Sequence, residues 1–327
     1  MQVFYNQSLK SYNTFWVEAL AKEIIFLENE EDILSLLPWG HNTTIFGWGS
    51  NILLLHQVYD RIGIIKNTGD PLVIEEDDKH VIVEVKAGSI RDHFVQWTLN
   101  HGYYGLENMG NIPGTIGAGV LGNIWAYGRE IGDFVYQVNY IDLKTKEIKT
   151  LTRDQCHYSY RRSAFKSLSH YIIVSARFIF HKNTYQLDHH YPDIQHYLAY
   201  NAISPQELTP IKLYQIICDI RSNKMPSWDE RGTAGSFWKN PLVSKEQLDR
   251  IKTIDPLVKS FPYKDHYKLA AGWLLEQLGY KWKIIRTASW WSVGCYKHQA
   301  LLVVNHEATG KEIDHFARSC EDIVYSS

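Results

Sequence analysis

The sequence has few of the features that mark secreted, membrane-spanning or zinc-binding proteins. Its 327 residues include only four cysteines, and no two of them form a Cys-x-x-Cys motif. Scattered cysteines argue against a disulfide framework and against a zinc site, and they favour reduced thiols in the cytoplasm. No apolar run approaches the roughly 18 residues that a membrane-spanning helix needs. We therefore expect neither a metal site nor a membrane partner.

The chain also lacks an excess of charge of either sign. Its 34 lysines and arginines nearly balance its 36 aspartates and glutamates, which gives a formal net charge of −2. Proteins that bind nucleic acid or membrane surfaces usually carry a basic patch, so this balance argues against both partners. Residues 1–6 show no basic segment followed by an apolar stretch, and hence no signal peptide. The sequence therefore predicts a cytoplasmic protein.

What the chain does have is enough apolar material for more than one core. Hydrophobic residues make up 45% of it, and 327 residues suffice for two or three domains of ordinary size. Short β-like runs and helical segments alternate, and the pattern changes near Ser204–Thr209. We expect a first region at 1–208, made of two α+β subdomains that divide near 57–70, and a second region at 209–327.

Two local patterns predict tight turns between strands. The apolar runs Thr43–Phe46 and Ile52–Leu55 flank Gly47-Trp48-Gly49-Ser50-Asn51, which indicates a strand, a glycine turn and a second strand. The acidic run Glu75–Asp78 separates two further β-like runs at 72–74 and 81–85. Such a charge run is typical of a solvated hairpin tip rather than of a metal site.

A helix is predicted from Ser89 to Asn100. Ser89 and Asp92 have the spacing of a capping box, and apolar residues recur on one helix face from Ile90 onward. The helix is predicted to stop near Asn100-His101-Gly102, because glycine is a typical signal for the C-terminal end of a helix.

The next stretch, 105–128, holds seven glycines and shows little periodicity. Glycine at this density lets backbone amides approach a ligand closely, as phosphate-binding loops do. Composition alone is equally compatible with a long flexible loop. The stretch is therefore a candidate ligand site only if other features support it.

Nine short motifs lie in order between residues 13 and 301. They are Asn13-Thr14-Phe15, Gly47-x-Gly49-Ser50-Asn51, Gly105-Leu106-Glu107-Asn108, Ile112-Pro113-Gly114, Asn123-Ile124-x-Ala126-Tyr127-Gly128, Tyr160-Arg161-x-Ser163-x-Phe165-Lys166, Ala234-Gly235-Ser236-Phe237-x-Lys239-Asn240-Pro241, Ala271-Gly272-Trp273-Leu274 and Gln299-Ala300-Leu301. Any one of them is a weak signal, but nine in this order are very specific. Together they resemble the UDP-N-acetylenolpyruvoylglucosamine reductases, the MurB family of flavoproteins.

The resemblance implies an α+β fold, with an FAD-binding domain of the vanillyl-alcohol-oxidase (PCMH) type at 1–208 and a smaller α+β substrate-binding domain at 209–327. Members of the family are oxidoreductases that use NADPH and a bound FAD. They reduce UDP-N-acetylglucosamine enolpyruvate to UDP-N-acetylmuramate for peptidoglycan, and so serve cell-wall biogenesis, cell shape and cell division. For this chain the resemblance implies the same activity on a nucleotide sugar in the cytoplasm, as a monomer and without a metal.

The resemblance also assigns roles to two catalytic residues. Hydride delivered to C3 of the enolpyruvyl group leaves negative charge on C2 and on the carboxylate. Arg161 matches the family's arginine for that charge, because a guanidinium fork suits a carboxylate. Ser236 matches the serine that donates a proton to C2, for which its surroundings must activate the hydroxyl. Read alone, Arg161 is typical of a surface ion-pair partner, and Ser236 of a turn.

Further residues match positions that bind FAD or the nucleotide sugar in the family. Those for FAD are Gly47, Gly49, Ser50, Asn51, Ile112, Pro113, Gly114, Gly117, Asn123, Ala126, Tyr127, Gly128 and Ile173. Those for the substrate are Tyr127 and Tyr191 in its channel, Lys224, Lys281 and Asn240 at the diphosphate, and Gln299 near the uridine. Outside these motifs, the two lysines would be interpreted as solvated surface residues.

Tryptophan departs from the family's pattern at several positions. Trp16, Trp125 and Trp282 stand where the family has glycine, and Trp48 occupies the variable position of Gly-x-Gly-Ser-Asn. Glycine supplies a positive φ or backbone clearance, and tryptophan supplies neither. An indole at position 125 is therefore expected to compete with the flavin for space and to lower its affinity, if the family's backbone is kept. Alternatively, the loops have moved and the indoles pack against the cofactor or one another.

A second departure concerns proton transfer. The family's third catalytic residue is a glutamate in a strand close to the C-terminus, and neither it nor that last strand has a counterpart before Ser327. We therefore expect either that the chain is truncated or that the protein has lost this acid. Gly122 also replaces a glutamine of the family's pattern. One alternative to an active reductase is therefore a non-catalytic relative, natural or altered, with impaired flavin binding and proton transfer. Another is a different flavin oxidoreductase, which the diphosphate matches in the second domain argue against.

Overall fold

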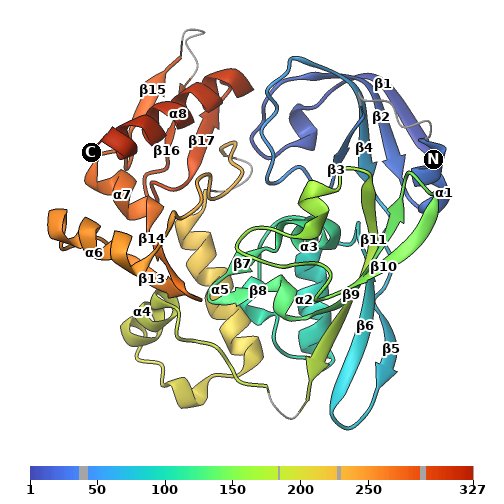
Figure 1. The fold of residues 1–327 in the computed structure, drawn as a ribbon, viewed down its shortest axis with the longest axis horizontal. Helices are drawn as coiled ribbons and strands as arrows, with labels where there is room; N and C mark the ends of the chain where they lie inside the picture. The colour runs from blue at the N-terminus through green and yellow to red at the C-terminus, as the bar shows by residue number, and fades with distance from the viewer. Residues whose placement is uncertain (37–42, 183–184, 227–229, 288–291, 327) are drawn as a thin grey trace. The chain divides into compact units, whose positions relative to one another are not determined.

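The computed structural model describes residues 1–36, 43–182, 185–226, 230–287 and 292–326 (Figure 1). The chain divides into two compact units, each discontinuous in sequence. Unit 1 consists of Met1–Gln7, Ala21–Gly49 and Tyr59–Asn223, and unit 2 of Ser8–Leu20, Ser50–Val58 and Lys224–Ser327. The sequence predicts a boundary at 208/209, whereas the units are divided at Asn223/Lys224 and two N-terminal segments are grouped with unit 2.

A five-stranded antiparallel sheet in the order β10-β9-β11-β6-β5 forms the centre of unit 1. Its strands are β5 (Leu72–Glu76), β6 (His80–Lys86), β9 (Val135–Asp142), β10 (Glu147–Thr152) and β11 (Tyr171–His181). Helix α2 (Arg91–Asn100) packs on this sheet, with the ring of Phe94 at 5.0 Å from Phe178 and 6.3 Å from Phe180 between centroids. This apolar contact holds the first turn of α2 in place for the candidate site.

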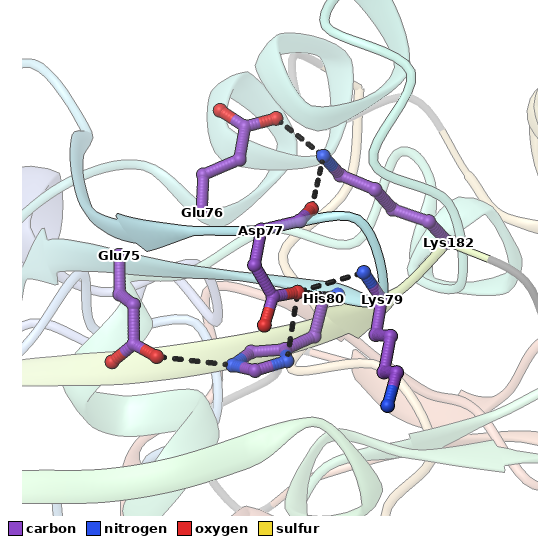
Figure 2. Close-up of polar contacts among 6 residues, drawn as sticks. All are labelled: Glu75, Glu76, Asp77, Lys79, His80 and Lys182. Atoms are coloured by element: carbon purple, nitrogen blue, oxygen red, sulfur yellow. Dashed lines mark hydrogen bonds and ion pairs between the residues drawn. The ribbon is translucent and has the colours of Figure 1, made fainter.

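The hairpin of β5 and β6 confirms the prediction of a charged tip between two strands. Figure 2 shows how its side chains are paired: the ammonium of Lys182 donates to a carboxylate oxygen of Glu76 at 2.7 Å and to the carbonyl of Asp77 at 2.8 Å. The Asp77 carboxylate accepts from the backbone amides of Lys79 and His80. These contacts close the turn and account for the acidic run as a structural feature.

Three further helices of unit 1 carry or contact motif residues of the candidate site. They are α3 (Ile116–Gly122), α4 (Pro192–Tyr200) and α5 (Pro210–Lys224, whose last residue is grouped with unit 2). A short hairpin joins β7 (Trp125–Ala126) to β8 (Arg129–Glu130). Short 3-10 helices occur at Lys10–Tyr12, Glu107–Met109, Ile131–Asp133, Ala164–Ser167 and Pro205–Glu207. The stretch 105–128 is thus an ordered chain of turns and short elements rather than a flexible loop.

A second sheet has the strand order β1-β2-β4-β3. Its strands are β1 (Gln2–Ser8), β2 (Leu20–Leu27), β3 (Thr43–Phe46) and β4 (Val58–Ile65), and helix α1 (Glu30–Ser35) follows β2. The predicted strand at 43–46 is confirmed. The predicted strand at Ile52–Leu55 is wrong, because this segment has no regular secondary structure. Its apolar character serves packing instead: Leu54 is buried, and a Cβ on Gly310 would lie only 1.7 Å from the Leu54 carbonyl.

Unit 2 contains two three-stranded sheets. One has the order β12-β14-β13 and the other β15-β16-β17. The strands are β12 (Leu242–Val243), β13 (Ser260–Tyr263), β14 (His266–Leu269), β15 (Ile284–Arg286), β16 (Ser292–Cys295) and β17 (Val303–His306), with helices α6 (Lys245–Ile254), α7 (Ala271–Gln277) and α8 (Gly310–Ser326). None of the helices in the described ranges has the length and apolar composition to span a bilayer.

Hydrogen bonds explain why an N-terminal segment is grouped with unit 2. The buried amide of Asn305 donates to the Phe15 carbonyl at 2.8 Å, and the backbone amide of Thr233 donates to the Thr14 carbonyl at 2.8 Å. A Cβ on Gly232 would lie 2.3 Å from the Phe15 oxygen, so the two backbones approach as closely as glycine allows.

The φ angles of the tryptophans show whether the backbone keeps the conformation that favours glycine. Trp16 and Trp282 have φ values of 58° and 66°, in the left-handed region that favours glycine. Trp48 and Trp125 do not have positive φ. The family's glycine-type backbone is therefore retained at two of the positions, where a tryptophan side chain costs about 1–2 kcal/mol.

We predict that Trp282→Gly stabilises the protein by about 0.5–1 kcal/mol. The indole at this position is 68% exposed, so little burial is lost, and relief of the left-handed strain exceeds the entropic cost of glycine, which is about 0.5–1 kcal/mol. The matched control is Trp48→Gly, an exposed tryptophan without positive φ, which should be destabilised slightly. Thermal unfolding measures the change in stability of both variants relative to the wild type. Equal losses of stability in the two variants would contradict the strain argument.

Candidate functional site

The turn at Asn111–Gly114, which contains the Ile-Pro-Gly motif, is anchored by side chains of two helices. The guanidinium Nη2 of Arg91 donates to the carbonyls of Ile112 at 3.0 Å and Pro113 at 2.7 Å. The backbone amide of Arg91 donates to the Gly114 carbonyl at 3.0 Å, and Gly114 itself has a φ of 124°. One arginine at the start of α2 therefore fixes three consecutive carbonyls.

The beginning of the same turn is held by two other charged side chains. The carboxylate of Asp92 accepts the backbone amide of Asn111 at 2.5 Å, and Nε of Arg221 on α5 donates to the Asn111 carbonyl at 2.9 Å. Tyr214, also on α5, donates its hydroxyl to the Asp92 carboxylate. Thus α2 and α5 together determine the path of the turn.

The glycine turn after β3 lies against the start of α3. A Cβ on Gly47 would be 2.8 Å from Oγ1 of Thr115 and 3.2 Å from Cβ of Ala118, and Gly49 has a left-handed φ of 72°. Two predicted FAD-binding motifs of unit 1 are therefore brought together. Ser50 and Asn51 of the same motif are grouped with unit 2, where they are half-buried and exposed.

Three other predicted FAD-binding residues have structural contacts of their own. A Cβ on Gly117 would lie 2.9 Å from that of Ala87, so this glycine permits close packing. Asn123, left-handed at the end of α3, donates its amide to Glu130 and to the Ser159 carbonyl and accepts the amide of Gly132. Ile173 is buried in the core of unit 1. The side chain of Asn123 is fully engaged, so a contact with FAD there would use its backbone.

Arg161 is half-buried and has an unusual backbone conformation. Its φ is 57°, and its carbonyl accepts the ammonium of Lys166 at 2.8 Å. Among the described residues, no carboxylate pairs with its guanidinium, which excludes the surface ion-pair interpretation. Burial lowers the pKa of Arg161 from its usual value, although arginine stays charged at neutral pH.

The two predicted substrate tyrosines belong to one small aromatic cluster. The ring of Tyr191 makes edge-to-face contacts with Trp125 at 5.6 Å and Tyr127 at 5.2 Å between centroids. Tyr127 has a φ of 45°, and its carbonyl accepts the amide of Asn108 at 2.8 Å. Burial raises the pKa of both tyrosine hydroxyls. The indole of Trp125 is half-buried and packs on Tyr191, a contact that neither of the two sequence interpretations names.

Two small residues complete this part of unit 1. Ala126 is buried with Tyr127 in the cluster that joins α4 and α5. Gly128 has a φ of 96°, and a Cβ there would lie 2.9 Å from a carboxylate oxygen of Asp188. Both residues are therefore held close to the tyrosine pair.

In unit 2 the predicted proton donor pairs with a residue three positions after the predicted uridine contact. Ser236 forms an isolated antiparallel bridge with Leu302, whose amide donates to the Gln299 carbonyl at 3.1 Å. Gly235 before the serine has a left-handed φ of 76°. Ser236 is exposed, and no hydrogen bond of its hydroxyl is present within the described residues.

The predicted diphosphate residues of unit 2 differ in exposure. The side-chain oxygen of Asn240 accepts the first backbone amide of α7, from Ala271, at 3.1 Å. Lys224 ends α5 and is half-buried, whereas Lys281 is exposed and pairs with Glu276 at 3.3 Å. The described residues contain no group of three or more histidine, cysteine or acidic side chains that could hold a metal ion.

Sequence reasoning missed Arg91 and Arg221, which anchor the turn. A signal for Arg91 existed, because the buried residues of α2 follow the helical spacing 91, 94, 95, 98 and 99. A charged residue at the first position of an apolar stripe must have a polar partner inside the protein. Arg221 has a comparable place on α5, one residue after the buried Ile220.

Two family models match the chain: the FAD binding domain at residues 21–152, and the UDP-N-acetylenolpyruvoylglucosamine reductase C-terminal domain at 226–327. The reductase of that name from Bdellovibrio bacteriovorus is 38% identical over 100% of this chain and 96% of its own length. The chain belongs to this reductase family. The Flavobacterium johnsoniae reductase is 37% identical, again over 100% of this chain and 96% of the relative. The family resemblance of the nine motifs is thereby confirmed.

A solved structure supports the fold of this family member. The UDP-N-acetylenolpyruvylglucosamine reductase (MurB) from Thermus caldophilus aligns with a TM-score of 0.64 at 18% identity, over 98% of this chain and 94% of the other. At that identity the likeness concerns the fold alone. The predicted α+β class, with an FAD-binding domain and a reductase C-terminal domain, is confirmed.

The reductase-family motif Gly105-Leu106-Glu107-Asn108 contains a buried carboxylate. Glu107 accepts the backbone amide of Gly105 at 2.7 Å and the hydroxyl of Tyr185. Burial nevertheless raises the pKa of Glu107, because the hydrogen bonds do not offset the loss of water. The folded protein therefore binds this proton more tightly than the unfolded chain does.

We predict that the contribution of Glu107 to stability falls as the pH rises. It is fully present below the carboxyl's pKa in the unfolded chain and is lost as the pH passes the raised pKa of the folded state. The free energy of unfolding is measured with urea at pH values from 4 to 7 for the wild type and for Glu107→Gln. The wild-type value minus the variant value should decrease as the pH rises.

The control for this measurement is Glu84→Gln. For Glu84, burial opposes ionisation, but hydrogen bonds from Arg177 and Ser175 outweigh it and lower the pKa. The stability of the wild type relative to this control variant should therefore fall toward acid pH, the opposite trend. The same trend in both variants would contradict the assignment of Glu107.

Proposed function

We propose that this protein catalyses the NADPH-dependent reduction of UDP-N-acetylglucosamine enolpyruvate to UDP-N-acetylmuramate, with FAD as bound cofactor, in peptidoglycan synthesis. The observation that carries the proposal is the 38% identity to a named reductase over the whole chain. The domain models for FAD binding and for the reductase C-terminus support it. In the proposal, residues 1–208 bind FAD and residues 209–327 bind the nucleotide sugar.

Features of unit 1 fit a large polar cofactor. The loops that match FAD-binding motifs contain left-handed Gly49 and Gly114, which leave backbone amides accessible. Two buried polar atoms, Nε of Arg91 and Oδ1 of Asn108, have no hydrogen-bond partner within the described residues. Buried polar atoms are normally satisfied, so these two are candidates for contacts with a ligand or water.

When bound, FAD supplies the redox chemistry by taking up two electrons from NADPH and passing them to the substrate. In the proposed reaction Arg161 binds and orients the enolpyruvyl carboxylate. Its lack of a carboxylate partner within the described residues supports this role, because its charge is not already neutralised. Tyr127 and Tyr191 line the substrate channel, and their mutual packing keeps their rings in place.

The residues of unit 2 have three roles in the proposal. Ser236 holds the proton that C2 of the substrate receives, and its exposed hydroxyl is not used by a protein hydrogen bond. Lys224, Lys281 and Asn240 bind the diphosphate, and Gln299 lies near the uridine. Lys281 is exposed, and its ion pair with Glu276 lies at the surface, where such pairs are weak, so a phosphate can replace that partner at little cost.

We also propose that the protein acts in the cytoplasm as a monomer. All four cysteines are free, and three of them are buried, which is compatible with a reducing compartment. The nucleotide-sugar substrate is itself a small, charged molecule. Size-exclusion chromatography with light scattering measures the oligomeric state directly.

A non-catalytic relative is the second candidate, favoured by the tryptophan at position 125. We predict that Trp125→Gly leaves the retention of FAD unchanged, because the indole already packs on Tyr191. The measurement is the visible absorbance of desalted protein before and after incubation with excess FAD. The control is Trp97→Phe, on α2. A clear rise in retained flavin for Trp125→Gly alone would favour the second candidate.

We predict that Ser236→Ala separates the two half-reactions. Reduction of the flavin by NADPH should stay intact, whereas reoxidation by the enolpyruvyl sugar should slow by roughly 10²–10⁴-fold, as expected for loss of a general acid. Stopped-flow absorbance of the flavin follows each step separately. The control is Ser244→Ala, which removes the N-cap of α6 and should change neither rate. Equal slowing of both half-reactions would show that Ser236 has another role.

A further inference from the structure

Arg91 is a charged residue buried in the core of unit 1. It is 2% exposed and belongs to the apolar stripe of α2 with Phe94, Val95 and Leu99. Transfer of a charge out of water is strongly unfavourable unless the interior supplies partners. An arginine at this position therefore needs an explanation beyond packing.

The partners of Arg91 are main-chain carbonyls rather than a carboxylate. Its Nη2 donates to Ile112 and Pro113, and its Nε has no hydrogen-bond partner within the described residues. A Cβ at Gly119 would lie 2.8 Å from Nη1, so the glycine there makes room for the guanidinium. The adjacent Asp92 attracts Arg91, but its carboxylate accepts hydrogen bonds from other groups.

Two more arginines are close enough for their charges to affect Arg91. Burial, and next the repulsion from Arg221, lower the pKa of Arg91 to about 9, and Arg161 adds a smaller repulsion. Arg221 interacts with the hydroxyl of Tyr127 as well as with the turn. Asp92 attracts both Arg91 and Arg221 and so balances part of this positive charge, whereas Arg161 has no carboxylate partner within the described residues.

We propose that Arg91 is a positioning residue of the flavin site, which holds the Ile112–Gly114 turn and raises the reduction potential of the flavin through its charge. The proposal rests on the FAD-dependent function, because the turn carries a motif that is predicted to bind FAD. A fixed positive charge stabilises the more electron-rich form of a bound ligand, and charge close to the flavin ring is one of the means by which a protein sets its potential. Hydrogen bonds to two carbonyls keep that charge in a fixed place.

The test separates the charge of Arg91 from its hydrogen bonds. Arg91→Gln keeps amide donors for the carbonyls and removes the charge, whereas Arg91→Lys keeps the charge. The control is Arg177→Gln, an arginine of β11 that pairs with Glu84. For each variant we would measure the midpoint potential of the bound flavin by dye-linked photoreduction, and the affinity for oxidised FAD by fluorescence titration.

We expect Arg91→Gln to weaken binding of reduced FAD about tenfold more than binding of oxidised FAD, which lowers the midpoint potential by about 30 mV for a two-electron couple. Arg91→Lys should restore most of the potential, and Arg177→Gln should leave it unchanged. An unchanged potential in Arg91→Gln, with equal weakening of both redox forms, would limit Arg91 to a structural role and overturn the proposal.

Three further outcomes also decide the test. If Arg91→Gln fails to bind FAD, the potential of Arg91→Lys decides: a value close to wild type supports the charge, and a value lowered as far as predicted for Arg91→Gln contradicts it. If Arg91→Lys also fails to bind FAD while its thermal unfolding equals that of wild type, the charge is not sufficient and the proposal is overturned. A wild type that binds no FAD would instead contradict the proposed function.

Discussion

The candidate site of unit 1 depends on hydrogen bonds from charged side chains to the carbonyls of one turn. Residues 111–114 have no regular secondary structure that could satisfy their backbone groups. Arg91, Asp92 and Arg221 provide those partners, and each comes from a helix. Buried backbone groups without partners are costly, so the turn has one favoured conformation while these side chains are in place. Helix α2 is in turn fixed by apolar packing on the sheet, and α5 by its apolar cluster with α4.

Unit 2 uses the same principle with neutral side chains. Asn305 holds the Phe15 carbonyl, and Asn13 holds its own turn by donating to the carbonyls of Leu9 and Val17. The result is a unit assembled from chain segments that are nearly 300 residues apart in sequence. Close approach at Gly232 and Gly310 shows how tightly these segments fit. The support for Ser236 therefore includes residues from both ends of the chain.

The sequence predicts those features of the fold that depend on local residue patterns or on the order of several motifs. The helix predicted from Ser89 to Asn100 is observed as α2 (Arg91–Asn100), because apolar residues recur on one of its faces. The order of the nine motifs predicted the family and the FAD-binding domain. In contrast, the apolar run at Ile52–Leu55 looked like a strand, although its burial comes from a distant contact with Gly310. Apolar character alone does not distinguish a buried strand from an irregular segment that is buried by a distant contact.

Other features could not be predicted because they depend on tertiary contacts. The predicted capping box at Ser89 is wrong: α2 has Ile90 at its N-cap, and the carboxylate of Asp92 binds the Asn111 amide instead. Arg91 was missed because its partners are carbonyls of another segment, which no sequence spacing reveals. The left-handed backbone at Trp16 and Trp282 was also visible only in the fold, since the residue type argues against it.

The space that Gly119 leaves for Arg91 couples two positions that are 28 residues apart in sequence. A larger residue at 119 would displace the guanidinium, and a small apolar residue at 91 would leave a void beside the glycine and two carbonyls without donors. Each residue therefore restricts which neighbours the other can accept. A substitution at only one of the two positions is therefore expected to destabilise the protein until the other position also changes. For this reason we expect the two positions to change together among homologues.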